Sequence, residues 1–251
     1  MGIIMEEMTK SNNLPSVKSL ESENKSENIM LSGNKYKFWI SRNFNIGLRK
    51  PFQWALKRYF DFILSFIGII LTSPILLIIA AAIKFESEGS VFFKQKRIGL
   101  YGKEFYMYKF RSMKNNAEEN LDLLKDMNET NSIMFKMSED PRITNVGKII
   151  RKYSLDELPQ LFNVLKGEMS LIGPRPPLPD EVEKYENWHY IKFSTYPGLT
   201  GLWQVSGRAS IKDFNLVIKL DFKYTEDWNL FQDLRILLKT IPVVIGAKGA
   251  S

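Results

Sequence analysis

The chain of 251 residues contains no cysteine and only one histidine, His189. Disulfide frameworks, thiolate metal sites and cysteine nucleophiles are therefore excluded, and so is any metal site that needs two histidines. Covalent catalysis would have to use a hydroxyl, a lysine or a carboxylate. His189 lies between Trp188 and Tyr190, and we interpret it as a structural residue.

The best-known phosphate-binding and zinc-binding motifs are missing too. The chain has no G-x-x-x-x-G-K-[ST] loop, no G-x-G-x-x-G, no Asp-x-Asp and no H-E-x-x-H. Positive charge, by contrast, is abundant: the formal net charge is +7 and the pI is about 9.3. Such a charge suits nucleic acid, an anionic membrane or a polyphosphate substrate, and the apolar residues decide among them.

The first 58 residues divide into two segments of different composition. Residues 1–34 are rich in Ser, Asn, Glu and Lys without an apolar period, so we predict a disordered polar tail. Residues 35–58 are basic and aromatic, which is typical of a membrane interface, although a surface helix with scattered cations has the same composition. Arg58 precedes Asp61 by one helical turn, so these two side chains are expected to pair.

Residues 62–83 form an apolar run without a charge, and about 20 such residues suffice to cross a bilayer. Ser73-Pro74 interrupts the run. The proline frees a backbone carbonyl, which a hydroxyl of Thr72 or Ser73 can satisfy. Basic residues flank both ends, and basic flanks belong on the cytoplasmic side. We therefore predict a re-entrant membrane helix over 59–85, broken at Ser73 and Pro74; a kinked span and a buried core helix are the alternatives.

Residues 86–245 are predicted to form one folded domain, and the fold class is α+β, mainly helical. The predicted elements are a hairpin over 91–113 around Gly99 and Gly102, a polar helix over 114–127, a short basic helix at the end of 141–152 and a helix over 154–167 that stops at Gly167. Residues 170–210 are rich in Gly and Pro and are expected to be irregular. Residues 211–245 are helical, and their last stretch, LFQDLRILLKTIPVVI, is amphipathic and suits a membrane surface.

Two adjacent carboxylates, Asp156 and Glu157, are the strongest local candidates for chemistry. One interpretation is structural: Ser154 caps a helix, and Glu157 completes a capping box three residues on. The other is functional: close to a helix N-terminus that attracts phosphate and to Arg151, one carboxylate holds a hard cation while the other attacks phosphorus. Spacing alone favours the first interpretation, and both stay open.

Three further segments carry cations or glycines in patterns that suit phosphate binding. In Gly173–Pro177 the prolines stiffen the backbone and leave Arg175 projecting. In Pro197–Arg208 three glycines and an arginine can bring backbone amides close to phosphates. In Lys109–Arg111 two cations share one face of a strand. The structural alternatives are a rigid turn, a loop that leads into an edge strand with Trp203 buried, and a half-buried strand.

Taken together and in their order along the chain, these motifs resemble the bacterial sugar transferase family. The runs that carry the resemblance are KRYFD, the apolar segment broken at Ser73-Pro74, YKFRSM, DPRIT, RKYSLDELPQLFNVLKGEMSLIGPRP and YPGLTGLWQVSGR. These proteins are monotopic polyprenyl-phosphate hexose-1-phosphate transferases, and the resemblance covers roughly residues 55–242. It implies an N-terminal re-entrant membrane helical hairpin and a cytoplasmic α/β catalytic domain over 86–245 with interfacial amphipathic helices.

The resemblance also implies a reaction. A hexose-1-phosphate passes from a UDP-sugar, with UDP-glucose or UDP-galactose favoured, to undecaprenyl phosphate, and UMP leaves. This is the initiating step of exopolysaccharide, capsule or O-antigen synthesis. By resemblance Asp156 is the nucleophile, which gives an aspartyl-phosphosugar intermediate, and Glu157 helps to bind Mg²⁺, so both carboxylates are predicted metal residues. The implied substrate-binding residues are Lys109, Arg151, Pro174, Arg175, Pro176 and Arg208.

The expected partners are a UDP-sugar, a polyprenyl phosphate and membrane lipid, but no nucleic acid; a homo-oligomer stays open. The expected location is the bacterial inner (cytoplasmic) membrane, with the catalytic domain on its cytoplasmic face. With one apolar segment, the chain resembles the short family members that consist of the catalytic core. The alternative hypothesis is a non-catalytic, membrane-anchored scaffold of a polysaccharide assembly complex, which does not need Asp156 and Glu157 intact.

Overall fold

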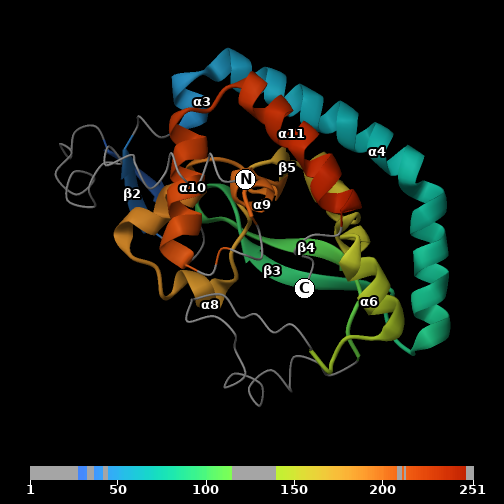
Figure 1. Cartoon of the computed structure of the whole chain (residues 1–251). Helices are drawn as coiled ribbons and strands as arrows, with labels where there is room; N and C mark the ends of the chain where they lie inside the picture. The colour runs from blue at the N-terminus through green and yellow to red at the C-terminus, as the bar shows by residue number, and fades with distance from the viewer. Residues whose placement is uncertain are drawn as a thin grey trace.

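The computed structural model of the chain describes residues 28–32, 37–41, 45–114, 140–207, 211 and 213–246. Residues 115–127 of the predicted polar helix and the predicted substrate-binding residue Arg208 lie outside this part of the chain. Helices predominate, and the described strands form three separate two-stranded sheets rather than one large sheet (Figure 1). The prediction of an α+β, mainly helical fold is therefore confirmed.

The three sheets differ in direction. Strands β1 (Asn28–Ser32) and β2 (Lys37–Ser41) pair antiparallel, as do β3 (Phe92–Ile98) and β4 (Glu104–Phe110), whereas β5 (Ser170–Ile172) and β6 (Gly198–Thr200) pair parallel. The hairpin predicted over 91–113 is confirmed as β3–β4. The disorder predicted for 1–34 is wrong for β1, and the region 170–210, predicted as irregular, contains β5 and β6.

The longest helix, α4, covers Pro51–Glu86 and follows the short helix α3 (Ile46–Arg49). It begins earlier than the predicted segment because Pro51 occupies its first turn, where a missing N–H does no harm. The predicted break at Pro74 does not end the helix, which bends and continues (Figure 1). The Ser73 hydroxyl donates to the Ile70 carbonyl at 2.8 Å, the group that Pro74 leaves without an amide donor. The predicted hydroxyl substitution is thereby confirmed.

The middle of α4 carries apolar side chains that no other element covers. Within the described residues α4 is the one helix long and apolar enough to cross a membrane, and 11% of its most apolar window is buried. Because a core helix would be buried, that alternative is wrong. The exposed apolar residues of this stretch are Phe60, Phe62, Leu64, Phe66, Ile67, Ile70, Leu71, Ile75, Leu77 and Ile78.

Both ends of α4 are attached to the same folded body. Near its start, Arg58 donates to Asp61 at 2.8 Å, as predicted, and Asp61 accepts from the Leu171 amide at 3.0 Å. Near its end, Ile79 and Ile83 pack with Phe110 of β4 and Ile150 of α6 (Asn145–Lys152). One side of α4 stays packed on the domain between these ends, since Ser65 is fully buried and Ile69 packs against the core that contains Leu161. The exposed apolar side chains of its middle face outward.

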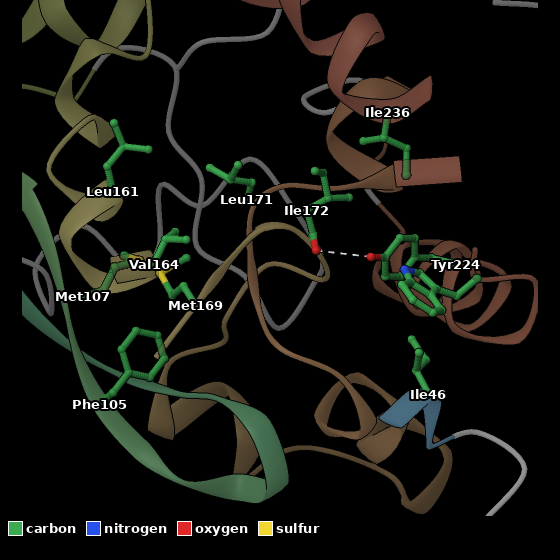
Figure 2. Packing of buried hydrophobic residues seen from close by; sticks show 11 residues of the cluster. Ile46, Phe105, Met107, Leu161, Val164, Met169, Leu171, Ile172, Tyr224 and Ile236 are labelled. Carbon is green, nitrogen blue, oxygen red and sulfur yellow. Dashed lines mark hydrogen bonds between the residues drawn. The ribbon is translucent and has the colours of Figure 1, made fainter. Parts of the chain in front are cut away.

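The core that supports the rest of the fold gathers residues from six elements (Figure 2). Phe105 and Met107 of β4 lie beside Leu161 and Val164 of α7 (Gln160–Leu165). On the far side of this cluster the Tyr224 hydroxyl lies 3.2 Å from the Ile172 carbonyl, drawn as a dashed line in Figure 2. The helices that complete this side of the domain are α9 (Leu202–Val205), α10 (Phe214–Glu226) and α11 (Leu230–Ile245).

A second cluster, of aromatic and apolar side chains, encloses His189. It joins η6 (Asn187–Ser194) and α10, with α8 (Pro179–Val182) beside it. The His189 ring is buried; its Nδ1 accepts from the Glu186 amide at 3.1 Å and its Nε2 lies 3.3 Å from Asn215 Oδ1. The interpretation of His189 as structural is confirmed.

Candidate active site

Asp156 and Glu157 lie in a single 3₁₀ turn, η5 (Leu155–Glu157), that precedes α7. The helix predicted over 154–167 is therefore divided at Pro159, and it ends as predicted at Gly167, whose φ is +79°. Ser154 adopts a left-handed conformation with φ 55° and makes no side-chain cap. The capping-box interpretation of Ser154 and Glu157 is consequently wrong, which leaves the acidic pair without that structural role.

Lys109 of β4 lies against both carboxylates. Its Nζ is 2.8 Å from Glu157 Oε1 and 4.0 Å from Asp156 Oδ2. The side chains of Lys109, Asp156 and Glu157 retain 16%, 12% and 11% exposure, so they are mostly enclosed without being sealed from solvent. The structure thus brings three of the predicted site residues together from segments 48 positions apart. The cation of Lys109 offsets part of the negative charge of the two neighbouring carboxylates.

Asn163 of α7 holds the acidic turn against β4, and sequence reasoning missed it. Its Nδ2 donates to the Tyr106 carbonyl at 2.7 Å, and its Oδ1 accepts from the Tyr108 amide at 3.0 Å. Asn163 is completely buried, so these bonds replace the ones it would make with water. The signal available in the sequence was a single polar residue among the apolar positions of QLFNVL, where an amide has to find a partner.

The loop Gly173–Pro177 is held by its carbonyls, because its three prolines have no amide donor. The Gly198 amide donates to Pro174 O at 2.9 Å, Arg97 Nη1 donates to Pro176 O at 3.0 Å and the Ile98 amide donates to Pro177 O at 3.1 Å. Pro174 and Pro176 are buried, whereas Arg175 between them is partly exposed. The backbone geometry therefore fits the prediction of a rigid loop that projects one arginine.

The glycines of the segment that begins at Pro197 serve a close backbone crossing. A Cβ at Gly198 would lie 2.1 Å from Gly173 N, and a Cβ at Gly201 would lie 2.2 Å from Gly173 O. The Gly173 amide donates to Thr200 O at 2.9 Å, and Trp203 is buried. For Gly198 and Gly201 the structural alternative is the correct one, since their missing side chains let β6 approach the proline-rich loop.

The remaining predicted cations differ in their surroundings. Arg151 and Arg175 are partly buried, and neither side chain makes a hydrogen bond or an ion pair with another described residue. The positive charge of Arg175 lowers the pKa of Arg97, and the negative charge of Glu157 acts on it in the opposite direction. Arg151 acts instead on Asp140. No contact joins Arg151 to Asp156 or Glu157 in the part of the chain that the structure describes.

Asp140 is itself held in its ionised form. Its side-chain hydrogen bonds from Arg142, the shortest of them 2.6 Å, lower the pKa of the Asp140 carboxyl, and the charge of Arg151 adds to this. The pair forms the loop before α6, whose N-terminus Thr144 caps by accepting from the Gly147 amide at 2.9 Å. The short basic helix predicted at the end of 141–152 is confirmed.

The acidic pair suits a metal ion that is shared with a substrate. The described residues contain no group of three or more His, Cys, Asp or Glu side chains that could hold a metal ion. Mg²⁺ commonly binds one or two carboxylates and completes its shell with waters and substrate phosphates. Asp156 and Glu157 therefore fit a Mg²⁺ ion that arrives with a phosphate-bearing substrate, and they do not form a complete site of their own.

Comparison with known proteins assigns a context to this geometry. The family model described as "Bacterial sugar transferase" matches residues 52–247. The chain is 41% identical over 208 residues to an "Exopolysaccharide production protein" of Rhizobium meliloti, which covers 81% of this chain and 92% of that protein. It is 44% identical over 194 residues to a "Galactosyl transferase" of Streptococcus agalactiae, covering 77% of this chain.

A third relative matches over a longer stretch. The chain is 40% identical over 244 residues, or 94% of its length, to an "Undecaprenyl-phosphate galactose phosphotransferase" of Salmonella typhimurium. These relatives differ in size: the chain spans 49% of the Salmonella protein and 43% of the Streptococcus protein, but 92% of the Rhizobium protein.

Proposed function

Because this chain belongs to the bacterial sugar transferase family, we propose that it transfers a hexose-1-phosphate from a UDP-sugar to undecaprenyl phosphate and releases UMP. Relatives named for galactose-phosphate transfer to undecaprenyl phosphate and for exopolysaccharide production support this reaction. UDP-galactose or UDP-glucose is the proposed donor, and the product starts an exopolysaccharide, capsule or O-antigen chain. The observation that carries the proposal is the enclosed group of Lys109, Asp156 and Glu157.

The proposed chemistry has two displacements at one phosphorus atom. A carboxylate oxygen of Asp156 attacks the phosphorus that bears the sugar; the bond to the bridging oxygen breaks, and UMP leaves with that oxygen. The acyl phosphate that results is then attacked by an oxygen of the lipid phosphate, which restores the Asp156 carboxylate. Lys109, whose Nζ lies 4.0 Å from Asp156 Oδ2, offsets negative charge beside the attacking carboxylate, and Arg175 neutralises charge on the donor phosphates.

Asp156 and Glu157 are the residues that would hold a Mg²⁺ ion. Bound there with the donor, the ion would neutralise charge on the phosphates and stabilise the leaving oxygen. Arg151 stays a proposed substrate residue. Its partly buried guanidinium makes no polar contact with the described residues and so keeps its donors for an anion.

We also propose that α4 enters the membrane as a re-entrant helix. The attachment of both its ends to one body supports this, because a straight span would carry them to opposite sides. Helix α11 supports it further, since its exposed apolar residues recur every three or four positions and form a stripe that suits a membrane surface. The stripe consists of Phe231, Leu234, Leu238, Ile241 and Ile245. The domain then lies on one face of the inner membrane, and the basic flanks of α4 make this the cytoplasmic face.

The test is UMP release by detergent-solubilised protein with undecaprenyl phosphate, Mg²⁺ and a panel of UDP-sugars. We expect release with one donor, and Asp156→Asn is expected to reduce it by about 10³-fold or more, the scale of removing a nucleophile. Asp180→Asn removes an exposed carboxylate from α8 and serves as the matched control. Undiminished release by Asp156→Asn would overturn the nucleophile. Folded protein that binds the membrane but releases no UMP with any donor would favour the scaffold.

A further inference from the structure

Arg97, in β3, is a buried cation that the proposed reaction does not use. Its residue exposure is 5%. Its Nη1 donates to the Pro176 carbonyl at 3.0 Å and its Nη2 donates to Gln95 Oε1 at 2.6 Å. Its Nε is buried without a hydrogen-bond partner among the described residues. Both of its hydrogen bonds thus go to neutral groups, and one of them goes to the loop that carries Arg175.

The charge of Arg97 is not neutralised by an ion pair. No carboxylate of the described residues lies within ion-pair distance of its guanidinium. Burial, followed by the positive charge of Arg175, lowers the pKa of Arg97 to about 10, while Glu181 and Glu157 act in the opposite direction. Arg97 therefore stays charged at neutral pH, and a buried charge without a counter-ion is costly unless an anion approaches it.

The position of Arg97 in the two-stranded β3–β4 ribbon explains how its side chain reaches the loop Gly173–Pro177. Side chains two positions apart point to the same face of a strand, and Phe93 lies opposite Lys109 in the antiparallel register. Arg97 therefore shares its face of the ribbon with Lys109, which contacts the acidic pair. The next residue of β3, Ile98, donates its amide to Pro177. One face of one ribbon thus supports the acidic pair at one end and the proline-rich loop at the other.

We propose that Arg97 is a positioning residue for recognition of the donor diphosphate. Its hydrogen bond to the Pro176 carbonyl fixes the loop that carries the partly exposed Arg175, and its own charge raises the positive potential in which the diphosphate binds. This inference rests on the proposed function, because it assumes a nucleoside diphosphate donor. A diphosphate supplies the negative charge that the Arg97–Arg175 pair lacks, whereas the uridine part of the donor is neutral and gains nothing from Arg97.

The difference between UDP and uridine binding tests this role. Affinities of purified protein for UDP and for uridine are measured by calorimetry, without turnover, for the wild type and for Arg97→Gln. The glutamine can still donate to Pro176 but carries no charge. We expect UDP affinity to fall about 10-fold or more, the scale of losing a charged donor, and uridine affinity to change less than about 2-fold. Lys96→Gln removes a charge from the adjacent residue, whose side chain is half exposed and pairs with Glu104, and should leave both affinities unchanged.

A purely structural role would reduce the affinities for UDP and uridine equally, and that result would overturn the proposal, as would unchanged UDP binding. If Arg97→Gln does not purify as folded protein, Arg97→Lys replaces it. The lysine keeps the charge but has no fork to hold Pro176 and Gln95 together, so a smaller loss, again confined to UDP, is expected. The outcome is separable from the proposed function, since wild-type protein that binds UDP but releases no UMP refutes the reaction and leaves the Arg97 comparison intact.

Discussion

Two enclosed lysine–carboxylate pairs in this molecule have opposite surroundings. Lys57 of α4 donates to Asp233 at 2.7 Å and to the Ile172 carbonyl at 2.9 Å, and Asp233 also accepts from Tyr224 and Trp228. Among the described residues, the Lys109 ammonium contacts the two acidic residues of η5 and no other charged group. The Lys57 side chain is 2% exposed and that of Lys109 is 16% exposed. The lysine of the first pair is enclosed by protein partners, whereas the lysine of the second pair keeps some exposure to solvent. The carboxylates differ less, at 8% for Asp233 against 12% and 11% for Asp156 and Glu157.

The difference indicates what each pair does. A buried charge pair whose other donors and acceptors are all bonded can do no chemistry, but its loss is expensive because each partner would be left unpaired. A pair that keeps access to solvent can exchange a protein contact for a substrate contact at little expense. Lys57 therefore joins α4 to α11 through Asp233 and to β5 through Ile172, and the pair at Lys109 is the one assigned to the proposed reaction.

The largest expected effect comes from breaking the Lys57–Asp233 pair. Lys57→Met leaves the Asp233 carboxylate buried without its cation, and the free energy of unfolding should fall by about 3–5 kcal/mol. The measurement is denaturant unfolding in detergent. In the double variant Lys57→Met/Asp233→Asn the charge is gone while an acceptor for Tyr224 remains, so at least about half of the loss should return. If the free energy of unfolding of Lys57→Met lies within about 1 kcal/mol of the wild-type value, the Lys57–Asp233 pair is no more important for stability than an exposed pair, and the comparison fails.

Loss of the lysine in the second pair, Lys109, should reduce activity more than stability. Lys109→Met removes the cation beside Asp156, and UMP release is expected to fall about 10²–10³-fold, as for other electrostatic groups at a reacting centre. The free energy of unfolding should change by less than half of the Lys57→Met loss, because water still reaches the two carboxylates. Steady-state kinetics and unfolding on the same preparation check both parts. A loss of stability as large as that of Lys57→Met, with activity intact, would reverse the assignment.

His189 is a third buried polar group in this comparison, and both of its ring nitrogens have hydrogen-bond partners. Burial lowers the pKa of His189 below its ordinary value of 6.5, because removal from water disfavours the protonated ring. The folded state therefore binds fewer protons than the unfolded state, and this part of the stability is present above pH 6.5 and is lost as the pH falls through and below it. Unfolding of the wild type and of His189→Asn is compared across this range. Equal pH dependence in both proteins would contradict the prediction.

The local features of α4 were predictable, and its attachments were not. The uncharged run and Ser73-Pro74 predicted a long helix with a hydroxyl at the freed carbonyl, because both depend on neighbours in the sequence. The pairing of Arg58 with Asp61 is local too, and it was predicted. The partners of Lys57 lie 115 and 176 positions away, and no pattern around Lys57 indicates them.

The candidate active site likewise contains residues that the sequence predicted and residues that it did not. Asp156, Glu157 and Lys109 were predicted from family motifs, and the structure brings them together. The capping box failed because Ser154 takes a left-handed conformation, which a serine adopts seldom and which spacing rules do not foresee. Asn163 and Arg97 were missed because each acts through the backbone of a distant segment, where residue type alone gives little indication.

The hydrogen bonds of α4 also imply an order of events on the ribosome. The carbonyl that Pro74 frees within α4 is satisfied by Ser73, its immediate neighbour, so this part of the proposed anchor can form as soon as that stretch of chain has been made. The base of the anchor needs Ile172 and Asp233, which are translated long afterwards. The middle of the proposed anchor can therefore be completed early and its base late, because Lys57 has no access to Asp233 until α11 has been made.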